Sequence, residues 1–299
     1  NAKAARAGGV SLMALSLAAC GSDDDDDAVS AADPAPADPA PVTPVDPEPV
    51  APVNQSLMLT AGFDVISGGA GNDVISGGVS SAGTQTLNTL DSISGGAGTD
   101  TLSAQISTNV TPGSSGVEVY NIVATGAATL DLAGSTDVTS VTNNGSTALL
   151  TVTNVGGDVA LAVQNTASGA TFNYAAADVL GTADAKTVTL STVTGGTVNM
   201  GTGVESLTVH STGSANSIAA LSTSATTLTI TGDAALTIAA AGELTAQTTI
   251  DASAATGAIT LQSDAATNVT ITTGSGKDAI TADGANAIKE TINTGAGND

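Results

Sequence analysis

Glycine-rich segments that end in an aspartate are the stretches of this sequence best suited to chemistry. Segments 68–73 and 95–100 read GGAGND and GGAGTD. Glycine lets backbone carbonyls converge where a Cβ would clash, and Ca²⁺ takes about six to eight oxygen ligands at about 2.3–2.6 Å. One loop with one carboxylate cannot supply so many oxygens, so the pattern predicts a calcium site shared by two stacked loops. The candidate ligand positions are Gly68, Gly69, Gly71 and Asp73 in the first loop, and Gly95, Gly96, Gly98 and Asp100 in the second.

Which aspartates share an ion depends on the turn between these loops. In an uninterrupted roll of nonapeptides, loops on one edge recur about every 18 residues, which would pair Asp73 with Asp91. The residues before Asp91, TLNTL, include no glycine and would form a poor cradle. We prefer to interpret residues 77–91 as one enlarged turn, which brings the two complete loops together and pairs Asp73 with Asp100. Asp64 and Asp91 would then lie on the opposite edge, as a weak second site or none.

A second glycine-rich cluster occupies the last part of the sequence. Segments 273–278 and 294–299 read TGSGKD and TGAGND, with threonine in place of the first glycine. We expect Asp278 and Asp299 to pair as the aspartates of the first cluster do, although Lys277 weakens this cation site. For both clusters the alternative is that the glycines only form the turns of a solenoid. The candidate ligands here are Gly274, Gly276, Asp278, Glu290, Gly295, Gly297 and Asp299.

The loops and the residues after them fit the nonapeptide G-G-x-G-x-D-x-U-x, in which U is a large apolar residue. GGAGNDVIS (68–76) and GGAGTDTLS (95–103) fit completely, and TGSGKDAIT (273–281) fits with one replacement. The sequence therefore resembles the RTX calcium-binding repeat. The resemblance implies a parallel β-roll in which glycine-rich loops bind Ca²⁺ and short strands stack between them. Residue U should then point inward, at Ile66, Ile75, Ile93, Leu102, Ile280 and Ile292.

The region between the two clusters contains many short alternating strands. In these strands, from Ile230 to Ile292, every second isoleucine recurs after about 20 residues. This period is typical of stacked β coils. We therefore predict an all-β fold, with a β-roll over 57–103, a Thr/Ala/Val-rich β-solenoid over 104–272 and a second RTX-like segment over 273–299. A row of antiparallel sandwich domains is the alternative.

Three local features of this region carry further expectations. Segments 174–181 and 216–223 could each form one or two helical turns. GVEVYNI (116–122) and GVESLTV (203–209) open alike, and we interpret them as a repeated structural unit.

Composition restricts the classes of partner. The net charge is −23, from 28 acidic and 5 basic residues, and such a surface repels nucleic acid. With two Phe, two Tyr and no Trp, a large core must come from many small and β-branched side chains. The single cysteine, Cys20, excludes an internal disulfide and a cysteine-based zinc site.

The segment 1–20 has the pattern of an export signal. A short positive stretch precedes the apolar run VSLMALSLAA (10–19), which is too short to span a bilayer. LAAC (17–20) resembles a bacterial lipobox, and the resemblance implies lipidation of Cys20 and attachment to the outer membrane. A buried structural cysteine is the alternative. Residues 21–56 are rich in Asp and Pro and predict a disordered, extended tether.

The sequence favours a structural role over an enzymatic one. The lone histidine, His210, lies in an alternating strand with its side chain expected outward, and the chain offers no nucleophile with a base. RTX repeats beside a Thr/Ala/Val/Gly-rich β region resemble bacterial surface-layer proteins, which implies a calcium-stabilised cell-surface rod or lattice that self-associates or binds a surface polymer. The alternatives are a calcium-dependent adhesin stalk and the non-catalytic part of a secreted RTX enzyme. RTX and surface-layer proteins of this kind usually leave by type I secretion, whereas a lipobox implies general export.

Overall fold

The computed structural model describes residues 51–240, 244–282 and 288–299. The chain divides into two units, Asn1–Pro49 and Val50–Asp299, and the described residues all belong to the second. The predicted export signal with Cys20, and residues 21–50 of the predicted tether, therefore lie outside the described residues. The end of the predicted tether is a correction, because Ser56 belongs to a strand and Gln55 N donates a hydrogen bond to Asp73.

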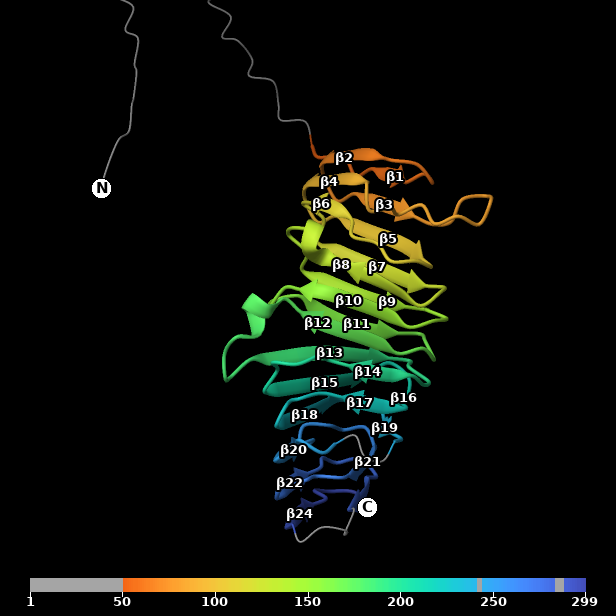
Figure 1. Cartoon of the computed structure of the whole chain (residues 1–299). Coiled ribbons are helices and arrows are strands. Elements are labelled where there is room, and N and C mark those ends of the chain that lie inside the picture. Colours follow the sequence, from red (N-terminus) through yellow and green to blue (C-terminus); the bar gives the residue numbers. More distant parts are fainter. Residues whose placement is uncertain (1–50, 241–243, 283–287) are drawn as a thin grey trace, which may run out of the picture. The chain divides into compact units, whose positions relative to one another are not determined.

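The second unit is a β-solenoid in which the chain alternates between one long sheet and a succession of shorter sheets (Figure 1). The long sheet contains, in spatial order, β1 (Ser56–Met58), β3 (Val74–Gly77), β5 (Thr101–Ile106), β7 (Val119–Ala124), β9 (Ser140–Asn144), β11 (Ala160–Gln164), β13 (Ala185–Ser191), β15 (Ser206–Thr212), β18 (Thr227–Gly232), β20 (Thr249–Asp251), β22 (Val269–Thr272) and β24 (Glu290–Asn293).

Three shorter sheets cover successive parts of the solenoid. The first contains β2 (Val65–Ala70), β4 (Ser92–Ala97) and β6 (Gly113–Ser115). The second contains β8 (Ala128–Asp131), β10 (Leu150–Val155), β12 (Ala170–Tyr174), β14 (Thr197–Asn199) and β17 (Ala220–Ser222). The third contains β16 (Asn216–Ile218), β19 (Leu236–Ile238), β21 (Ile259–Ser263) and β23 (Ala279–Ala282). Two short 3₁₀ helices, η1 (Leu132–Gly134) and η2 (Ala176–Val179), interrupt the turns.

The coil length agrees with the period read from the isoleucines. Val209 pairs with Ile230, Ile250 with Ile271, and Ile271 with Ile292 across neighbouring parallel strands of the long sheet. The three pairs share one separation along the chain, and it matches the period in the sequence. The predicted all-β solenoid is confirmed, and the alternative of antiparallel sandwiches is wrong because the paired strands run parallel.

Strict alternation along the strands builds the core. In β15 the side chains of Leu207 and Val209 are buried, while His210 faces outward and its Nδ1 lies 3.0 Å from Thr231 Oγ1. Tyr120 and Phe172, two of the four aromatic residues, are fully buried in the same core. The rest of it consists mainly of Leu, Ile, Val and Ala, as the composition predicted.

The large apolar residues of the repeats face the core in most coils. Ile75, Ile93 and Leu102 are buried, and Ile66 and Ile280 are partly buried against the core. Ile292 was also expected to point inward, but 39% of it is exposed. It lies in β24, the last strand in the spatial order of the long sheet, so one side of it lacks a covering strand among the described residues.

The prediction of helical turns is wrong for one of the two segments. Segment 174–181 contains the single 3₁₀ turn η2, but segment 216–223 forms β16 and β17. The reason lies in Asn216, which is 2% exposed. Its Oδ1 accepts a hydrogen bond from Val193 N at 2.8 Å and its Nδ2 donates to Leu190 O at 3.2 Å, and these bonds hold the segment extended against the preceding coil.

Asp131 shows how a carboxylate stabilises the solenoid without a cation. Its Oδ1 accepts hydrogen bonds from Asn154 Nδ2 at 2.6 Å and from Ala133 N at 3.0 Å, which caps η1. The bond from Asn154 is the main reason that the pKa of Asp131 lies below its ordinary value.

Replacing Asp131 with alanine is expected to lower the free energy of unfolding by about 0.5–2 kcal/mol, the usual cost of a lost N-cap. Because the folded-state pKa is depressed, this contribution is complete above the unfolded-state pKa and is lost as the pH falls through the folded-state value. Urea unfolding of both proteins at neutral pH and at acidic pH measures it. A difference that stays the same in acid would contradict the argument.

Candidate metal centre

The solenoid has two edges, defined by the direction of the connecting turns. At the first edge the chain passes from a shorter sheet to the long sheet, and loops 68–73 and 95–100 lie there, between β2 and β3 and between β4 and β5. At the second edge the chain passes from the long sheet to a shorter one. Loops 273–278 and 294–299 follow β22 and β24 and so lie at the second edge.

The two complete loops stack directly on each other. β2 pairs with β4 so that Gly69 lies opposite Gly96. This is the register that the enlarged turn predicts. Within that turn, Val79 and Gln85 form an antiparallel bridge, so the extra residues fold back on themselves and leave the coil stacking intact (Figure 1, orange loop beside β3).

Asp73 and Asp100 form a ladder through one oxygen each. Asp73 N donates to Asp100 Oδ1 at 2.7 Å, and Gln55 N donates to Asp73 Oδ1 at 2.6 Å. Asp73 is 1% exposed and Asp100 is 0% exposed. The second oxygen of each carboxylate, Oδ2, is buried and has no hydrogen-bond partner among the described residues. A buried carboxylate oxygen without a partner is costly, and a bound cation would remove that cost.

Glycine backbone surrounds both unpartnered oxygens. A Cβ on Gly68 would overlap Asp73 Oδ2 and the carbonyl oxygen of Gly95. A Cβ on Gly95 would likewise overlap Asp100 Oδ2 and the carbonyl oxygen of Gly116. In both places a carboxylate oxygen and a carbonyl oxygen from the next coil converge beside a glycine, and these are the hard ligands that Ca²⁺ prefers. The residues present therefore fit a calcium ion.

The electrostatics of this edge also suit a hard cation. Burial, together with the negative charges of Asp73 and Glu118, raises the pKa of Asp100. The described residues include no group of three or more His, Cys, Asp or Glu placed to hold a metal. A metal here would therefore depend on backbone carbonyls as well as carboxylates, a ligand set that favours Ca²⁺ over transition metals.

Asp64 and Asp91 come together on the second edge, but their oxygens are already used. Asp64 N donates to Asp91 Oδ1 at 3.0 Å, and Asn88 N donates to Asp91 Oδ2 at 2.7 Å. Asp64 Oδ2 accepts from Thr60 N at 2.7 Å, and its Oδ1 accepts from Thr60 Oγ1 at 3.0 Å. This pair forms a hydrogen-bonded ladder. Of the two expectations for Asp64 and Asp91, a weak second calcium site or none, the ladder favours none.

The C-terminal pair repeats the geometry of the first cluster on the second edge. Asp278 N donates to Asp299 Oδ1 at 3.0 Å, and Asp278 Oδ1 accepts from Ile259 N at 2.8 Å. Asp278 is 4% exposed and its Oδ2 is buried without a partner among the described residues. Each glycine of these loops packs against a backbone carbonyl of the preceding coil. A Cβ would overlap that carbonyl oxygen at Gly274, Gly276, Gly295 and Gly297.

Glu290, a predicted ligand of the C-terminal cluster, does not join it. It is the first residue of β24, at the first edge, and its Oε1 accepts a hydrogen bond from Ser263 Oγ at 2.7 Å. Asp278 and Asp299 lie at the other edge. Glu290 therefore lies one strand away from the paired aspartates, as Asp91 does in the first cluster, and it cannot be a ligand of the Asp278–Asp299 site.

Sequence reasoning missed two residues that precede the first complete loop. Ser56 pairs with Val74, which places Gln55 opposite Asp73 and Asn54 opposite Asn72. Asn54 Oδ1 accepts from Asn72 N at 2.9 Å, and the Gln55 side-chain amide donates to the Gly68 carbonyl. The segment NQSLM (54–58) can be aligned with NDVIS (72–76), so the signal was present, without glycines.

Comparison with known proteins agrees with this geometry. Residues 54–80 and 90–106 match the family model of the RTX calcium-binding nonapeptide repeat, in four copies. These segments are RTX repeats. The match begins at Asn54 and includes both complete loops, and we call residues 54–106 the RTX coils.

The remaining comparisons found no match. No curated protein and no solved structure matches the chain, and the C-terminal loops lie outside the residues matched to the repeat family. In the part of the chain that the structure describes, no helix has the length and apolar character needed to cross a membrane.

Proposed function

We propose that this protein is a calcium-binding structural protein of the bacterial cell surface, similar to surface-layer proteins, in which Ca²⁺ stabilises a β-rod or lattice. The observation that carries the proposal is the pair of buried Oδ2 atoms of Asp73 and Asp100, which have no partner among the described residues and lie near a carbonyl of the next coil. Bound Ca²⁺ would supply positive charge between the coils. Asp73, Asp100 and the carbonyl of Gly95 would hold it.

The role we propose is not enzymatic. The His210 ring lies on the outer face, hydrogen-bonded to Thr231. The buried carboxylates of Asp73 and Asp100 take part in the hydrogen-bonded ladder between coils. The surface location rests on the resemblance of 1–20 to an export signal ending in Cys20 and on the strong negative charge. With Cys20 lipidated, the Asp/Pro-rich segment would connect the solenoid to the outer membrane.

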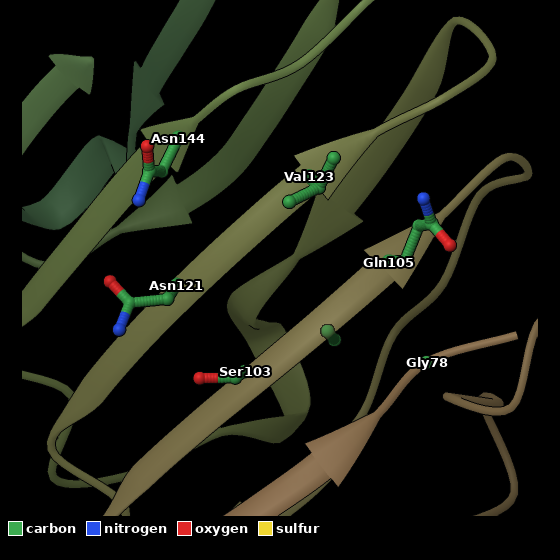
Figure 2. Close-up of a pocket in the computed structure, with 7 residues that line it drawn as sticks. Gly78, Ser103, Gln105, Asn121, Val123 and Asn144 are labelled. Carbon is green, nitrogen blue, oxygen red and sulfur yellow. The ribbon is translucent and has the colours of Figure 1, made fainter. Parts of the chain in front are cut away.

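An adhesin stalk is the second candidate, and one surface feature favours it. A shallow depression with a volume of about 360 Å³ lies on the outer face of the long sheet. Figure 2 shows polar side chains from neighbouring strands around it. Amide groups both donate and accept hydrogen bonds, as binding of a glycan or an extended peptide requires. The depression is lined by Gly78, Ser103, Ala104, Gln105, Asn121, Val123 and Asn144.

Calcium titration of the full chain tests the proposed function. We expect saturable heat in calorimetry and a rise in melting temperature, because a ligand at 100 times its Kd stabilises the folded state by about 2.7 kcal/mol. The double variant Asp73→Asn/Asp100→Asn should lose most of both effects while keeping similar side-chain volumes. An absence of heat and of any melting shift at millimolar Ca²⁺ would overturn the proposal.

Electron microscopy separates the two candidate roles. A surface-layer role predicts ordered sheets of the purified protein when calcium is added. An adhesin role predicts single rods in calcium, together with binding to a surface glycan or protein.

A further inference from the structure

The calcium-type geometry does not stop at the last RTX repeat. Asp100 Oδ2 is buried without a partner among the described residues, and the carbonyl that crowds it belongs to Gly116. Gly116 lies in the turn between β6 and β7, beyond the residues that match the repeat family. The third coil therefore places a carbonyl oxygen close to a carboxylate oxygen of the second.

Glu118 occupies in this third coil the place that Asp100 has in the second. Thr101 pairs with Val119, which sets Glu118 beside Asp100. Asp100 N donates to Glu118 Oε2 at 2.7 Å, just as Asp73 N donates to Asp100 Oδ1 at 2.7 Å. The turn here, Gly116 and Val117, is shorter than loop 95–99, and the longer glutamate side chain suits the shorter turn.

A second copy of this turn shows what the hydrogen bonds do without a cation. In GVE at 203–205, Asp184 N donates to Glu205 Oε2 at 2.9 Å, and Glu205 N donates to Asp184 O at 3.0 Å. Glu118 N likewise donates to Asp100 O at 3.1 Å. The ladder itself is therefore a structural device of the solenoid, in agreement with the shared GVE of the two segments.

The two turns differ in the carboxylate that precedes them. Asp184 Oδ2 accepts a hydrogen bond from Gly181 N at 3.0 Å, and both Asp184 and Glu205 are only half-buried. Asp100 is fully buried and its Oδ2 has no such donor in the described structure. Of these two turns, only the one at Glu118 thus combines an unsatisfied carboxylate oxygen, a convergent carbonyl and a second carboxylate.

We propose that Asp100, the Gly116 carbonyl and Glu118 form a further Ca²⁺ site, which joins the last RTX coil to the first coil of the Thr/Ala/Val-rich solenoid. The proposal rests on the proposed calcium function and extends it to residues outside the repeat motif. Glu118 contributes negative charge and an oxygen ligand from a turn that lacks the nonapeptide pattern. The ion would fasten the RTX coils to a neighbouring coil that is stacked by hydrogen bonds and apolar packing.

The test compares Glu118→Gln with Glu205→Gln in the full chain, by calorimetric titration with calcium alone. Glutamine keeps an oxygen that accepts the ladder hydrogen bond but removes the charge. Glu118→Gln should lose one bound Ca²⁺ per chain, or bind it at least about tenfold more weakly, the scale for loss of a metal-site partner. Glu205→Gln should bind like the wild type, and unfolding in chelator should give the same midpoint for both variants.

The outcomes are distinguishable from failure of the proposed function. If Glu118→Gln keeps the wild-type number and affinity of ions while Asp73→Asn loses binding, the RTX site stands and the further site is overturned. If the wild type itself binds no calcium, both proposals fall. A loss in Glu205→Gln equal to that in Glu118→Gln would also overturn this inference, because it would make the effect structural.

Discussion

Chelation of calcium is expected to open the RTX coils, residues 54–106, while the middle of the solenoid, from β9 to β20, stays folded. The reason is the burial of Asp73 and Asp100, which are at most 1% exposed and each leave one oxygen without a partner in the described structure. A buried, uncompensated charge costs several kcal/mol even after relaxation. The apolar side chains that these coils bury, among them Ile75, Leu87 and Leu102, have to offset two such charges.

Buried neutral side chains link several of the middle coils. Asn216 bonds Val193 N and Leu190 O, and the fully buried Asn143 donates from Nδ2 to Gly169 O at 3.4 Å. An amide side chain can donate and accept hydrogen bonds between coils without carrying a net charge. Removal of calcium therefore leaves these links intact, and the middle coils should keep their structure.

Hydrogen exchange read by mass spectrometry measures this difference along the chain. With chelator, amides of the RTX coils should lose nearly all protection, whereas amides of β9, β11 and β13 should keep theirs. The variant Asp73→Asn/Asp100→Asn is the control, because it removes the two buried charges of the RTX coils, which should then show little response to chelator. Uniform loss of protection along the whole chain, or none, would contradict the prediction.

The register of the first cluster could be predicted from the sequence because its information is local. A glycine-free stretch before Asp91 marked residues 77–91 as an insertion, and that alone set Asp73 beside Asp100. Inward positions such as Ile75 and Leu102 followed from alternation with period two. The coil length followed from the spacing of the isoleucines.

What could not be predicted depends on contacts between coils. The hydrogen-bond partner of Glu290, Ser263 Oγ, lies in another coil, so the sequence around Glu290 could not show that its carboxylate is already bonded. Gln55 and Glu118 lack the glycine pattern and acquire their positions only from the register of whole coils. Segment 216–223 has residues compatible with a helix, but the hydrogen bonds of Asn216 to the preceding coil hold it extended.

Glycine at position 95 is expected to be indispensable for steric reasons. A Cβ there would overlap the Gly116 carbonyl and Asp100 Oδ2, and the carbonyl is backbone that cannot rotate away. Gly95→Ala should therefore destabilise the RTX coils by more than about 4 kcal/mol in saturating calcium, among the largest effects of a single substitution. It should also abolish calcium binding at Asp100, because relief of the overlap separates the two coils whose oxygens converge there.

Gly78→Ala is the matched control, since a Cβ at Gly78 meets no atom within 4 Å. Neither glycine has a left-handed φ, so the two substitutions differ only in the room available for the new Cβ. Gly78→Ala should be neutral, or stabilising by up to about 1 kcal/mol through the lower entropy of the unfolded chain. Urea unfolding in calcium, with calorimetric titration of both variants, gives the comparison. Similar stability for the two variants would show that the coils can move apart at Gly95, and calcium would then have to bind without the close approach of the Gly116 carbonyl to Asp100.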